Sequence, residues 1–157
     1  YSLSDDDLGD LIAYLNSRSP VDNEAAVTEL NMFTIALLNA GQFGEVVRAR
    51  AIDHEAPRPD PSENYGAYLL AVGGCTFCHG NDLTGGQGPE PGAPPAPDIT
   101  GGGPWGERPF ATFAHAVRTG RKPDGGQINP AFMPWTGYGR MTDEDLRAIW
   151  NHLQQLP

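Results

Sequence analysis

The sequence of 157 residues is long enough for one domain plus additional elements, and its composition excludes several classes of protein. Its longest apolar stretch, from Met32 to Leu38, is far too short to span a membrane as a helix. With 20 Asp and Glu against 10 Lys and Arg, the net charge of -10 argues against binding to nucleic acid or to an anionic membrane surface. The 20 glycines and 15 prolines predict that much of the chain is loop.

An amphipathic helix is predicted at the start of the chain, and its pattern returns at the end. Residues 3–8 (LSDDDL) are echoed 138 residues later by residues 141–146 (MTDEDL). In both copies a Ser or Thr can cap a helix, acidic residues follow, and apolar residues continue at helical spacing. The repeat predicts that residues 1–21 are the last helix of a preceding domain, similar to the one that ends at residue 157. The alternative is that two ordinary amphipathic helices share a capping pattern.

Residues 22–62 are predicted to be a helical connector with a proline-rich end. A helical stretch is expected between Val27 and Val47, interrupted near Gly41 and Gly44. A linker with the sequence APRPDP then leads into the larger C-terminal domain.

The C-terminal domain, residues 63–157, is predicted to be mainly α-helical. Helices are expected at residues 63–72, at residues 110–119 and behind Thr142, with no clear strand pattern. Residues 80–106 hold nine glycines and six prolines, which argue against regular structure there. Three helices with such long loops bury little apolar surface by themselves, so we expect something other than side chains to fill the centre.

Both cysteines fall in one pentapeptide, Cys75-Thr76-Phe77-Cys78-His79, which is the attachment pattern of a c-type haem. Two thiols one helical turn apart can bond the two vinyl groups of a haem, and the adjacent histidine then binds its iron. A structural zinc site would need about four ligands, and a thioredoxin-like motif would follow a strand. A disulfide is a further alternative. The motif predicts one covalent haem c, held by Cys75, Cys78 and His79.

A methionine is expected to be the second axial ligand of the iron. Met141 occupies a helix-capping position and Met32 belongs to the N-terminal segment, which leaves Met133 in the loop at residues 129–135 (NPAFMPW). The prolines of this loop can hold a thioether rigidly toward a metal, so we predict that Met133 coordinates the iron. The alternatives are that Met133 is a packing residue and that His115 is the ligand.

Residues 64–157 resemble a class I c-type cytochrome domain. The resemblance rests on the run GCTFCHG at residues 74–80, on Met133-Pro134-Trp135 and on the terminal helix from Met141. Residues 82–86 (DLTGG) and 120–125 (GRKPDG) are similar to the multihaem cytochrome c subunits of bacterial membrane dehydrogenases. The resemblance implies a cytochrome c fold, in which the first and last helices cross beside the haem. It also makes residues 1–21 the tail of a preceding cytochrome c-like domain.

The same resemblance implies further residues around the haem. Members of the family have a proline carbonyl that hydrogen-bonds the proximal histidine. Four prolines are candidates for this role: Pro89, Pro91, Pro95 and Pro97. Trp105, Arg118 and Arg121 are candidates to contact the haem propionates, because a buried carboxylate needs a donor or a cation. The alternative is that these three are surface or packing residues.

The predicted function is electron transfer, because His79 and Met133 would fill both axial positions of the iron. Expected partners are a donor dehydrogenase or quinol-oxidising complex and an acceptor oxidase or reaction centre in a bacterial respiratory or photosynthetic chain. Docking is expected at the thioether edge near Thr76 and Phe77. The alternatives are a haem enzyme that acts on peroxide, nitrite or a sulfur oxyanion, and a structural subunit of a larger assembly. Thioether attachment implies the bacterial periplasm or the periplasmic face of the membrane.

Overall fold

The structure, a computed structural model, describes residues 3–22, 29–41, 60–62, 64–88, 92–106 and 108–157. The chain divides into an N-terminal unit, residues 3–58, and a C-terminal unit, residues 59–157. Most of the predicted proline-rich linker lies outside the described residues, as do Pro89 and Pro91. In the described part of the chain, no helix has the length and apolar character needed to cross a membrane.

The described N-terminal unit contains two helices, each with a capped first turn. Ser4 caps helix α1, Asp5–Ser17, as its hydroxyl accepts a hydrogen bond from the backbone N–H of Asp7 at 3.2 Å. Asn31 caps helix α2, Met32–Asn39, in the same way. Helix α2 is shorter than the helical stretch predicted there, part of which lies outside the described residues.

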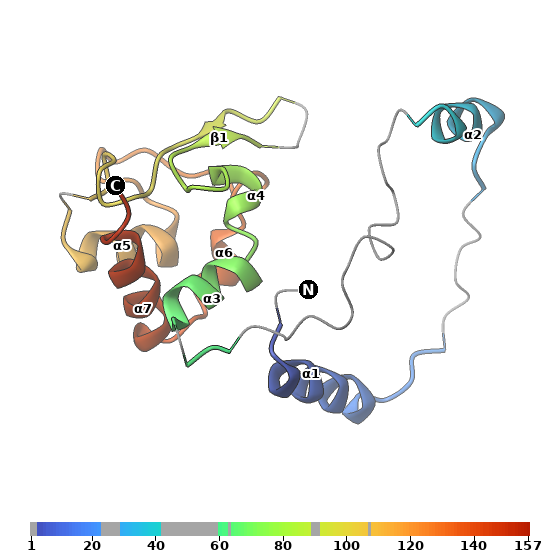
Figure 1. Cartoon of the computed structure of the whole chain (residues 1–157), viewed down its shortest axis with the longest axis horizontal. Helices are drawn as coiled ribbons and strands as arrows, with labels where there is room; N and C mark the ends of the chain where they lie inside the picture. Colours follow the sequence, from blue (N-terminus) through green and yellow to red (C-terminus); the bar gives the residue numbers. More distant parts are fainter. Residues whose placement is uncertain (1–2, 23–28, 42–59, 63, 89–91, 107) are drawn as a thin grey trace. The chain divides into compact units, whose positions relative to one another are not determined.

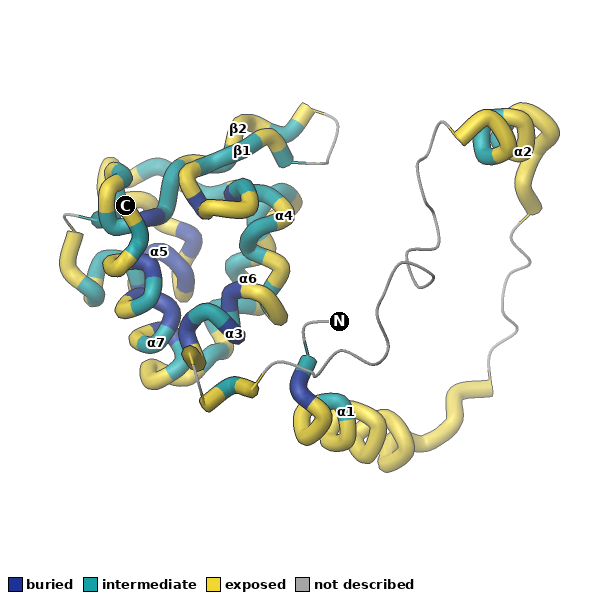
Figure 2. The backbone as a smooth tube through the Cα atoms, in the orientation of Figure 1, coloured by how far each residue is buried: buried dark blue, intermediate teal, exposed yellow. Residues whose placement is uncertain are grey.

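Most of helix α1 is exposed, as its yellow tube in Figure 2 shows, and this includes its apolar face. Leu11, Ile12 and Leu15 are 45%, 51% and 60% exposed. The helix is amphipathic, as the sequence predicts, but no described residue of α1 beyond its cap is buried. The described N-terminal residues therefore provide no core for this face.

The C-terminal unit is mainly α-helical, as predicted, and Figure 1 shows its arrangement. Its helices are α3 (Tyr65–Val72), α4 (Thr76–His79), α5 (Phe110–Thr119), α6 (Trp135–Tyr138) and α7 (Asp143–Leu153). Helices α3, α5 and α7 lie where the sequence predicts helices, and α4 and α6 are single turns.

A short antiparallel hairpin interrupts the long loop that follows α4. Strand β1 (Gly86–Gln87) pairs with strand β2 (Pro95–Ala96), with Gly86 opposite Ala96. The prediction that residues 80–106 lack regular structure is wrong at this point. Strands of two residues are too short to show an alternating apolar pattern in the sequence.

Helices α3 and α7 cross at very short range and lie side by side in Figure 1. A Cβ atom at Gly66 would collide with the backbone carbonyl of Ala148, so this approach requires glycine. Leu70 of α3 packs with Ile149 and Leu153 of α7 in one buried cluster. The crossing of the first and last helices of the domain, which the resemblance implies, is therefore present.

Helix α5 adds a second buried cluster around the start of α7. Ala114 and Val117 of α5 pack against Leu146, and Phe113 and Met141 contact both clusters. Figure 2 shows dark blue buried segments on α3, α5 and α7. These three helices form the frame on which the site is built.

Helix α7 begins with a reciprocal capping box that α3 reinforces. The Thr142 hydroxyl accepts from the N–H of Asp145 at 3.1 Å, and the Asp145 carboxylate accepts from the N–H of Thr142 at 2.9 Å. The Tyr65 hydroxyl donates to the same carboxylate at 2.7 Å. Burial acts to raise the pKa of Asp145, but the hydrogen bonds from Tyr65 and Thr142 outweigh it and hold the pKa below its ordinary value of 3.8.

We expect Asp145→Asn to lower the free energy of unfolding at pH 7 by about 1 kcal/mol, since it removes a charged acceptor at the helix N-terminus. When folding lowers the pKa of a carboxylate, the carboxylate stabilises the folded state to its full extent above the unfolded pKa of about 3.9. This stabilisation is lost as the pH falls through the folded pKa. Urea unfolding followed by circular dichroism between pH 7 and pH 2 measures the difference from wild type, which should close below about pH 4.

Glu144→Gln is the matched control for this experiment. Glu144 lies in the same exposed first turn of α7, outside the capping box. Its replacement should change the free energy of unfolding by less than about 0.5 kcal/mol. A difference between wild type and Asp145→Asn that is independent of pH would contradict the role given to the Asp145 carboxylate.

Candidate functional site

A cavity of about 700 Å³ with a mostly apolar lining lies inside the C-terminal unit. Helices α3, α5 and α7 contribute to its wall, together with the CxxCH segment and the loops that carry Pro97 and Met133. Apolar lining residues on the helices include Leu70, Phe113, Val117, Leu146, Ile149 and Leu153. A cavity of this size and character suits a large, flat, apolar ligand with a few fixed polar contacts.

Cys75, Cys78 and His79 all line this cavity. The N–H of His79 donates to the Cys75 carbonyl at 3.0 Å, so the motif forms a turn of helix. Both cysteines are free and only partly exposed. Burial raises the pKa of the Cys75 thiol to about 11, so this thiol is protonated near neutral pH.

His79 is buried, and its ring is oriented by a backbone carbonyl. Its Nδ1 lies 2.8 Å from the carbonyl oxygen of Pro97. A carbonyl oxygen only accepts, so Nδ1 carries a proton, and in the neutral imidazole the free lone pair is then on Nε2. Among the candidate prolines that the structure describes, Pro97 is thus the one that supports His79, and Pro95 lines the cavity wall.

Two methionines line the cavity, and their surroundings differ. Met141 packs against both buried clusters, just before the cap of α7. Met133 belongs to neither cluster and lies in the loop between α5 and α6. Met32 is 84% exposed in the N-terminal unit. Of the two cavity methionines, Met133 is therefore the one whose thioether is not engaged in packing the described core.

The other described histidines lie away from the cavity wall. His115 is exposed on α5, and its backbone carbonyl accepts a hydrogen bond from Thr119. The His152 ring is hydrogen-bonded to the Asn64 side chain at 3.1 Å. The structure gives no support to His115 as an alternative ligand. His54 lies outside the described residues.

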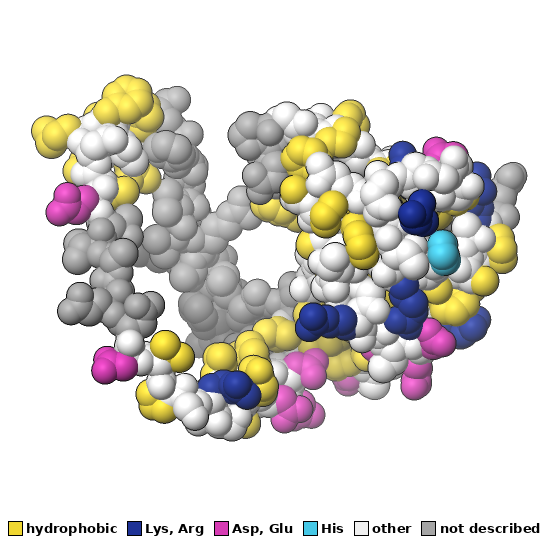
Figure 3. Space-filling model, turned by 180° about the vertical axis from the view of Figure 1, so that it is seen from behind, with side chains coloured by type: hydrophobic (Ala, Val, Ile, Leu, Met, Phe, Trp, Pro, Cys, Tyr) yellow, Lys and Arg dark blue, Asp and Glu magenta, His cyan; other side chains and the backbone are white. Residues whose placement is uncertain are grey.

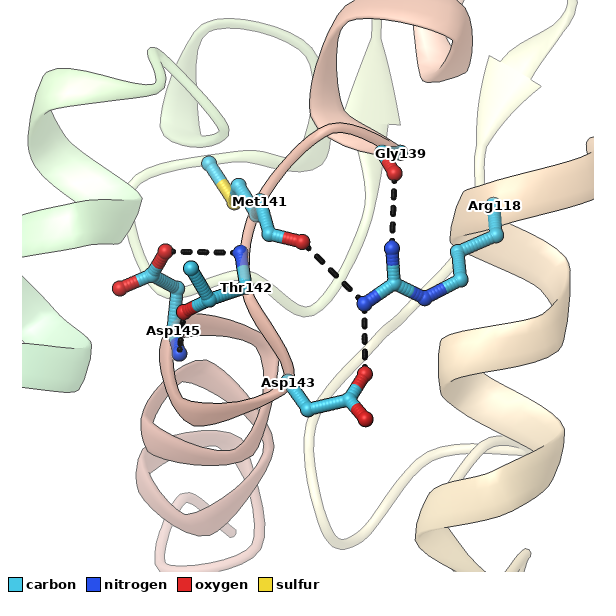
Figure 4. Close-up of polar contacts among 6 residues, drawn as sticks. All are labelled: Arg118, Gly139, Met141, Thr142, Asp143 and Asp145. Atoms are coloured by element: carbon cyan, nitrogen blue, oxygen red, sulfur yellow. Dashed lines mark hydrogen bonds and ion pairs between the residues drawn. The ribbon is translucent and has the colours of Figure 1, made fainter.

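The three residues expected at the haem propionates lie in different places. Trp105 lines the cavity, whereas Arg121 is exposed and does not. Arg118 binds the segment that leads into α7, as Figure 4 shows: it donates to the carbonyls of Gly139 at 2.8 Å and Met141 at 3.1 Å. It also forms an ion pair with the Asp143 carboxylate. These contacts fit the alternative of a packing residue: Arg118 joins α5 to the segment that leads into α7, which we call its bracket role.

Two side chains at the cavity were not predicted from the sequence. Lys122 is the one Lys or Arg in the described lining. Tyr138 also lines the cavity, and its hydroxyl donates to the Gly73 carbonyl at 2.8 Å, just before the CxxCH motif. Burial raises the pKa of Tyr138 above its ordinary value. No local signal could have found this contact, because it joins residues 65 positions apart.

The alternatives to a haem site fit these residues less well. Among the described residues, no three His, Cys, Asp or Glu side chains are grouped so that they could hold a metal ion. The motif follows helix α3, where a thioredoxin-like CxxC would follow a strand. The two cysteines are free thiols, not a disulfide.

Comparison with known families identifies the fold around this cavity. Residues 64–157 match the family described as Cytochrome c, which is more than half of the chain. The chain belongs to the cytochrome c family. Its C-terminal unit is therefore a mainly α-helical cytochrome c domain, as the motif and the resemblance predicted.

Several curated proteins are similar to this cytochrome c chain. The cytochrome c subunits of alcohol dehydrogenase (quinone) from Gluconacetobacter polyoxogenes and Komagataeibacter europaeus are each 37% identical to it over 95 residues, 54% of this chain and 20% of theirs. The fructose dehydrogenase cytochrome subunit of Gluconobacter japonicus is 33% identical over 134 residues, 78% of this chain and 26% of its own. This last match extends beyond the cytochrome c domain. The chain spans only 20% to 26% of the length of these relatives.

The residues of the cytochrome c domain fit a covalent haem c. The cavity has the size and apolar lining for a macrocycle, two free thiols lie on its wall, and the buried His79 uses Nδ1 for its hydrogen bond, which leaves Nε2 as its ligand atom. Cytochromes of this family use such a haem for electron transfer. Cys75, Cys78 and His79 are the residues that would hold it.

We expect Arg118→Gln to lower the free energy of unfolding of the haem-loaded protein by about 1 kcal/mol, because the amide cannot replace all the contacts of the guanidinium. Urea unfolding at low and high salt measures the effect. It should persist at high salt, because two of the three contacts are to uncharged carbonyls.

Arg121→Gln is the matched control, since Arg121 is exposed and lies three residues away in the chain. It should change the free energy of unfolding by less than about 0.5 kcal/mol. Unchanged stability in Arg118→Gln, together with a shifted midpoint potential, would contradict the bracket role and restore the propionate interpretation.

Proposed function

We propose that this cytochrome c domain transfers electrons through one covalently bound haem c whose axial ligands are His79 and Met133. The observation that carries the proposal is that His79, with Nε2 left free by the Nδ1 hydrogen bond to Pro97, lines the same apolar cavity as the Met133 thioether. When bound, the haem supplies an iron that alternates between the ferric and ferrous states.

The chain's own residues prepare the site for this role. The Pro97 carbonyl holds His79 in one tautomer and one orientation, so the ligand needs no proton movement when the iron changes charge. The apolar lining excludes water and disfavours the extra charge of the ferric state. A thioether ligand acts in the same direction and favours a relatively positive potential.

An electron carrier fits the cavity better than a haem enzyme. An enzyme acting on peroxide, nitrite or a sulfur oxyanion needs acid, base or substrate-binding groups beside the iron. Apart from the CxxCH motif, the titratable residues of the described lining are Lys122 and Tyr138. The Tyr138 hydroxyl is already used by the Gly73 carbonyl.

We propose that redox partners dock beside α4. Phe77 is 70% exposed between the two cysteines, and an apolar anchor of this kind suits a brief complex of small area. No Lys or Arg occurs in residues 59–107, whereas all six cations of the cytochrome c domain lie between Arg108 and Arg147. Figure 3 shows several Lys and Arg side chains on the face of the C-terminal unit that it displays. The segment that forms α4 therefore adds no positive charge to this surface, and we expect it to suit a neutral or basic partner.

The relatives support a place in a larger complex. They are cytochrome subunits of an alcohol dehydrogenase (quinone) and a fructose dehydrogenase. By analogy, we propose that a dehydrogenase or quinol-oxidising complex donates electrons to this domain and that an oxidase or reaction centre accepts them. The proposed location is the bacterial periplasm or the periplasmic face of the membrane, because haem is attached through thioethers there.

We also propose that residues 1–21 are the last helix of a preceding cytochrome c-like domain, followed by a connector at residues 22–62. Helices α1 and α7 are both capped by a hydroxyl that accepts from the backbone N–H three residues later. Ile149, Trp150 and Leu153 of α7 are all buried. The residues at the same positions of α1 are Leu11, Ile12 and Leu15, which are exposed. Such a face is what a last helix presents to the first helix of its own domain.

A pair of matched variants tests Met133 as the ligand. Met133→Leu should abolish the weak absorption band at the red end of the ferric spectrum that marks methionine ligation, and should allow rapid binding of cyanide or carbon monoxide. Met141→Leu removes a thioether from the same cavity at nearly constant volume. It should keep the band and cost less than about 1.5 kcal/mol of stability. A band that survives Met133→Leu and disappears in Met141→Leu would overturn the assignment.

Haem stoichiometry tests the preceding domain. The full-length protein should carry more than one covalent haem, counted by intact mass spectrometry and by the absorbance of the pyridine complex. In the variant Cys75→Ala/Cys78→Ala the count should fall by one, which identifies the haem of this domain. A full-length protein with a single haem would refute the proposed preceding domain and leave the His79/Met133 assignment intact.

A further inference from the structure

The loop that carries Met133 is closed on itself at Gly120, the residue that ends α5. The Gly120 carbonyl accepts two hydrogen bonds, from the N–H of Ile128 at 2.7 Å and from the Gln127 side chain at 2.9 Å. Gly120 has a φ of +67°, in the left-handed region that favours glycine. These bonds draw the first half of the loop back onto the end of α5.

Trp135 attaches the second half of the loop to the same region, next to Gly120. Its indole N–H donates to the Ile128 carbonyl at 3.0 Å. Its ring lies so close to Gly120 that a Cβ atom there would collide with it. Gly120, Gln127, Ile128 and Trp135 thus form one connected group, which we call the loop clasp.

Met133 lies between the two ends that the clasp holds. Its N–H donates to the Asn129 carbonyl at 3.1 Å, and its own carbonyl accepts from the N–H of Trp135 at 2.7 Å. Its side chain belongs to neither buried cluster. The placement of its thioether therefore depends on the loop backbone, and that backbone is held by the clasp.

We propose that the loop clasp, with Trp135 as its main positioning residue, sets how firmly the Met133 sulfur is held at the cavity. This inference rests on the proposed ligation of the iron by Met133. A site whose ligand is held by a fixed supporting group competes better against outside ligands than one on a loose loop. Trp135 itself does not line the cavity, so it acts only through the loop.

The test is a titration of the ferric, haem-loaded protein with imidazole, which competes with a protein ligand for the iron. Trp135→Phe keeps an aromatic ring and removes the N–H donor. It should raise the apparent affinity for imidazole about three- to tenfold, the ratio expected when one hydrogen bond that holds the bound state is lost. It should also weaken the red absorption band of methionine ligation.

Gln127→Ala is a second variant that leaves the indole in place. It removes the side-chain donor to the Gly120 carbonyl, from a residue that itself lines the cavity, and should change the imidazole affinity in the same direction. The inference therefore does not depend on the folding of Trp135→Phe alone. Arg121→Gln is the control on the same loop, because Arg121 is exposed and makes no contact with the cavity. It should bind imidazole as wild type does.

A double-variant comparison separates the clasp from the ligand. If the clasp acts through Met133, Trp135→Phe should add nothing to the imidazole affinity of Met133→Ala. Wild-type affinity in both Trp135→Phe and Gln127→Ala, or an equal increase in the Met133→Ala background, would overturn the clasp while leaving Met133 as the ligand. An unchanged absorption band in Met133→Ala would instead overturn the ligation itself, and the clasp with it.

Discussion

Helices α3 and α7 approach so closely at Gly66 that a side chain there would meet the backbone of Ala148, and the other elements of the domain are arranged around this crossing. The CxxCH motif follows directly after α3, so the crossing fixes where Cys75 and His79 enter the cavity. The hydrogen bond from Tyr65 to Asp145 ties the first turn of α3 to the cap of α7. Helix α5 then closes the frame by packing Val117 against Leu146.

The same frame brings loops that are far apart in the sequence to one cavity. Pro97 belongs to the loop before α5, yet its carbonyl selects the tautomer of His79. Two hydrogen bonds hold the segment around α6. Arg118, near the end of α5, donates to the Gly139 carbonyl, and Tyr138 donates to the Gly73 carbonyl before the motif. A rigid polar scaffold thus surrounds a mostly apolar wall. This combination suits a redox centre, whose ligands must not move when the charge of the iron changes.

The sequence predicted those features that depend on local chemistry. The hydroxyl caps of α1 and α7 and the apolar stripes of the helices follow from short-range preferences, and all are present. The CxxCH motif predicted the family, because its spacing reflects the chemistry of thioether attachment. The sequence left open whether Arg118 contacts a propionate or packs within the domain, because an arginine near a predicted carboxylate has the same local pattern as one that binds carbonyls of a distant loop. The hairpin of β1 and β2 was missed because strands of two residues leave no alternating pattern in the sequence.

The sequence by itself determined that the chain carries a c-type haem motif on a helical, loop-rich domain, since covalent attachment needs only residue types at fixed spacing. Tertiary structure decided which proline supports His79, because the sequence alone does not distinguish the four candidates. Among the candidates that the structure describes, Pro97 is the one whose carbonyl lies within hydrogen-bond distance of His79. It also distinguished the two cavity methionines, because the packing of Met141 against both clusters arises from helices far apart in sequence. Long-range geometry of this kind leaves no trace in local residue patterns, which is why only the folded domain shows it.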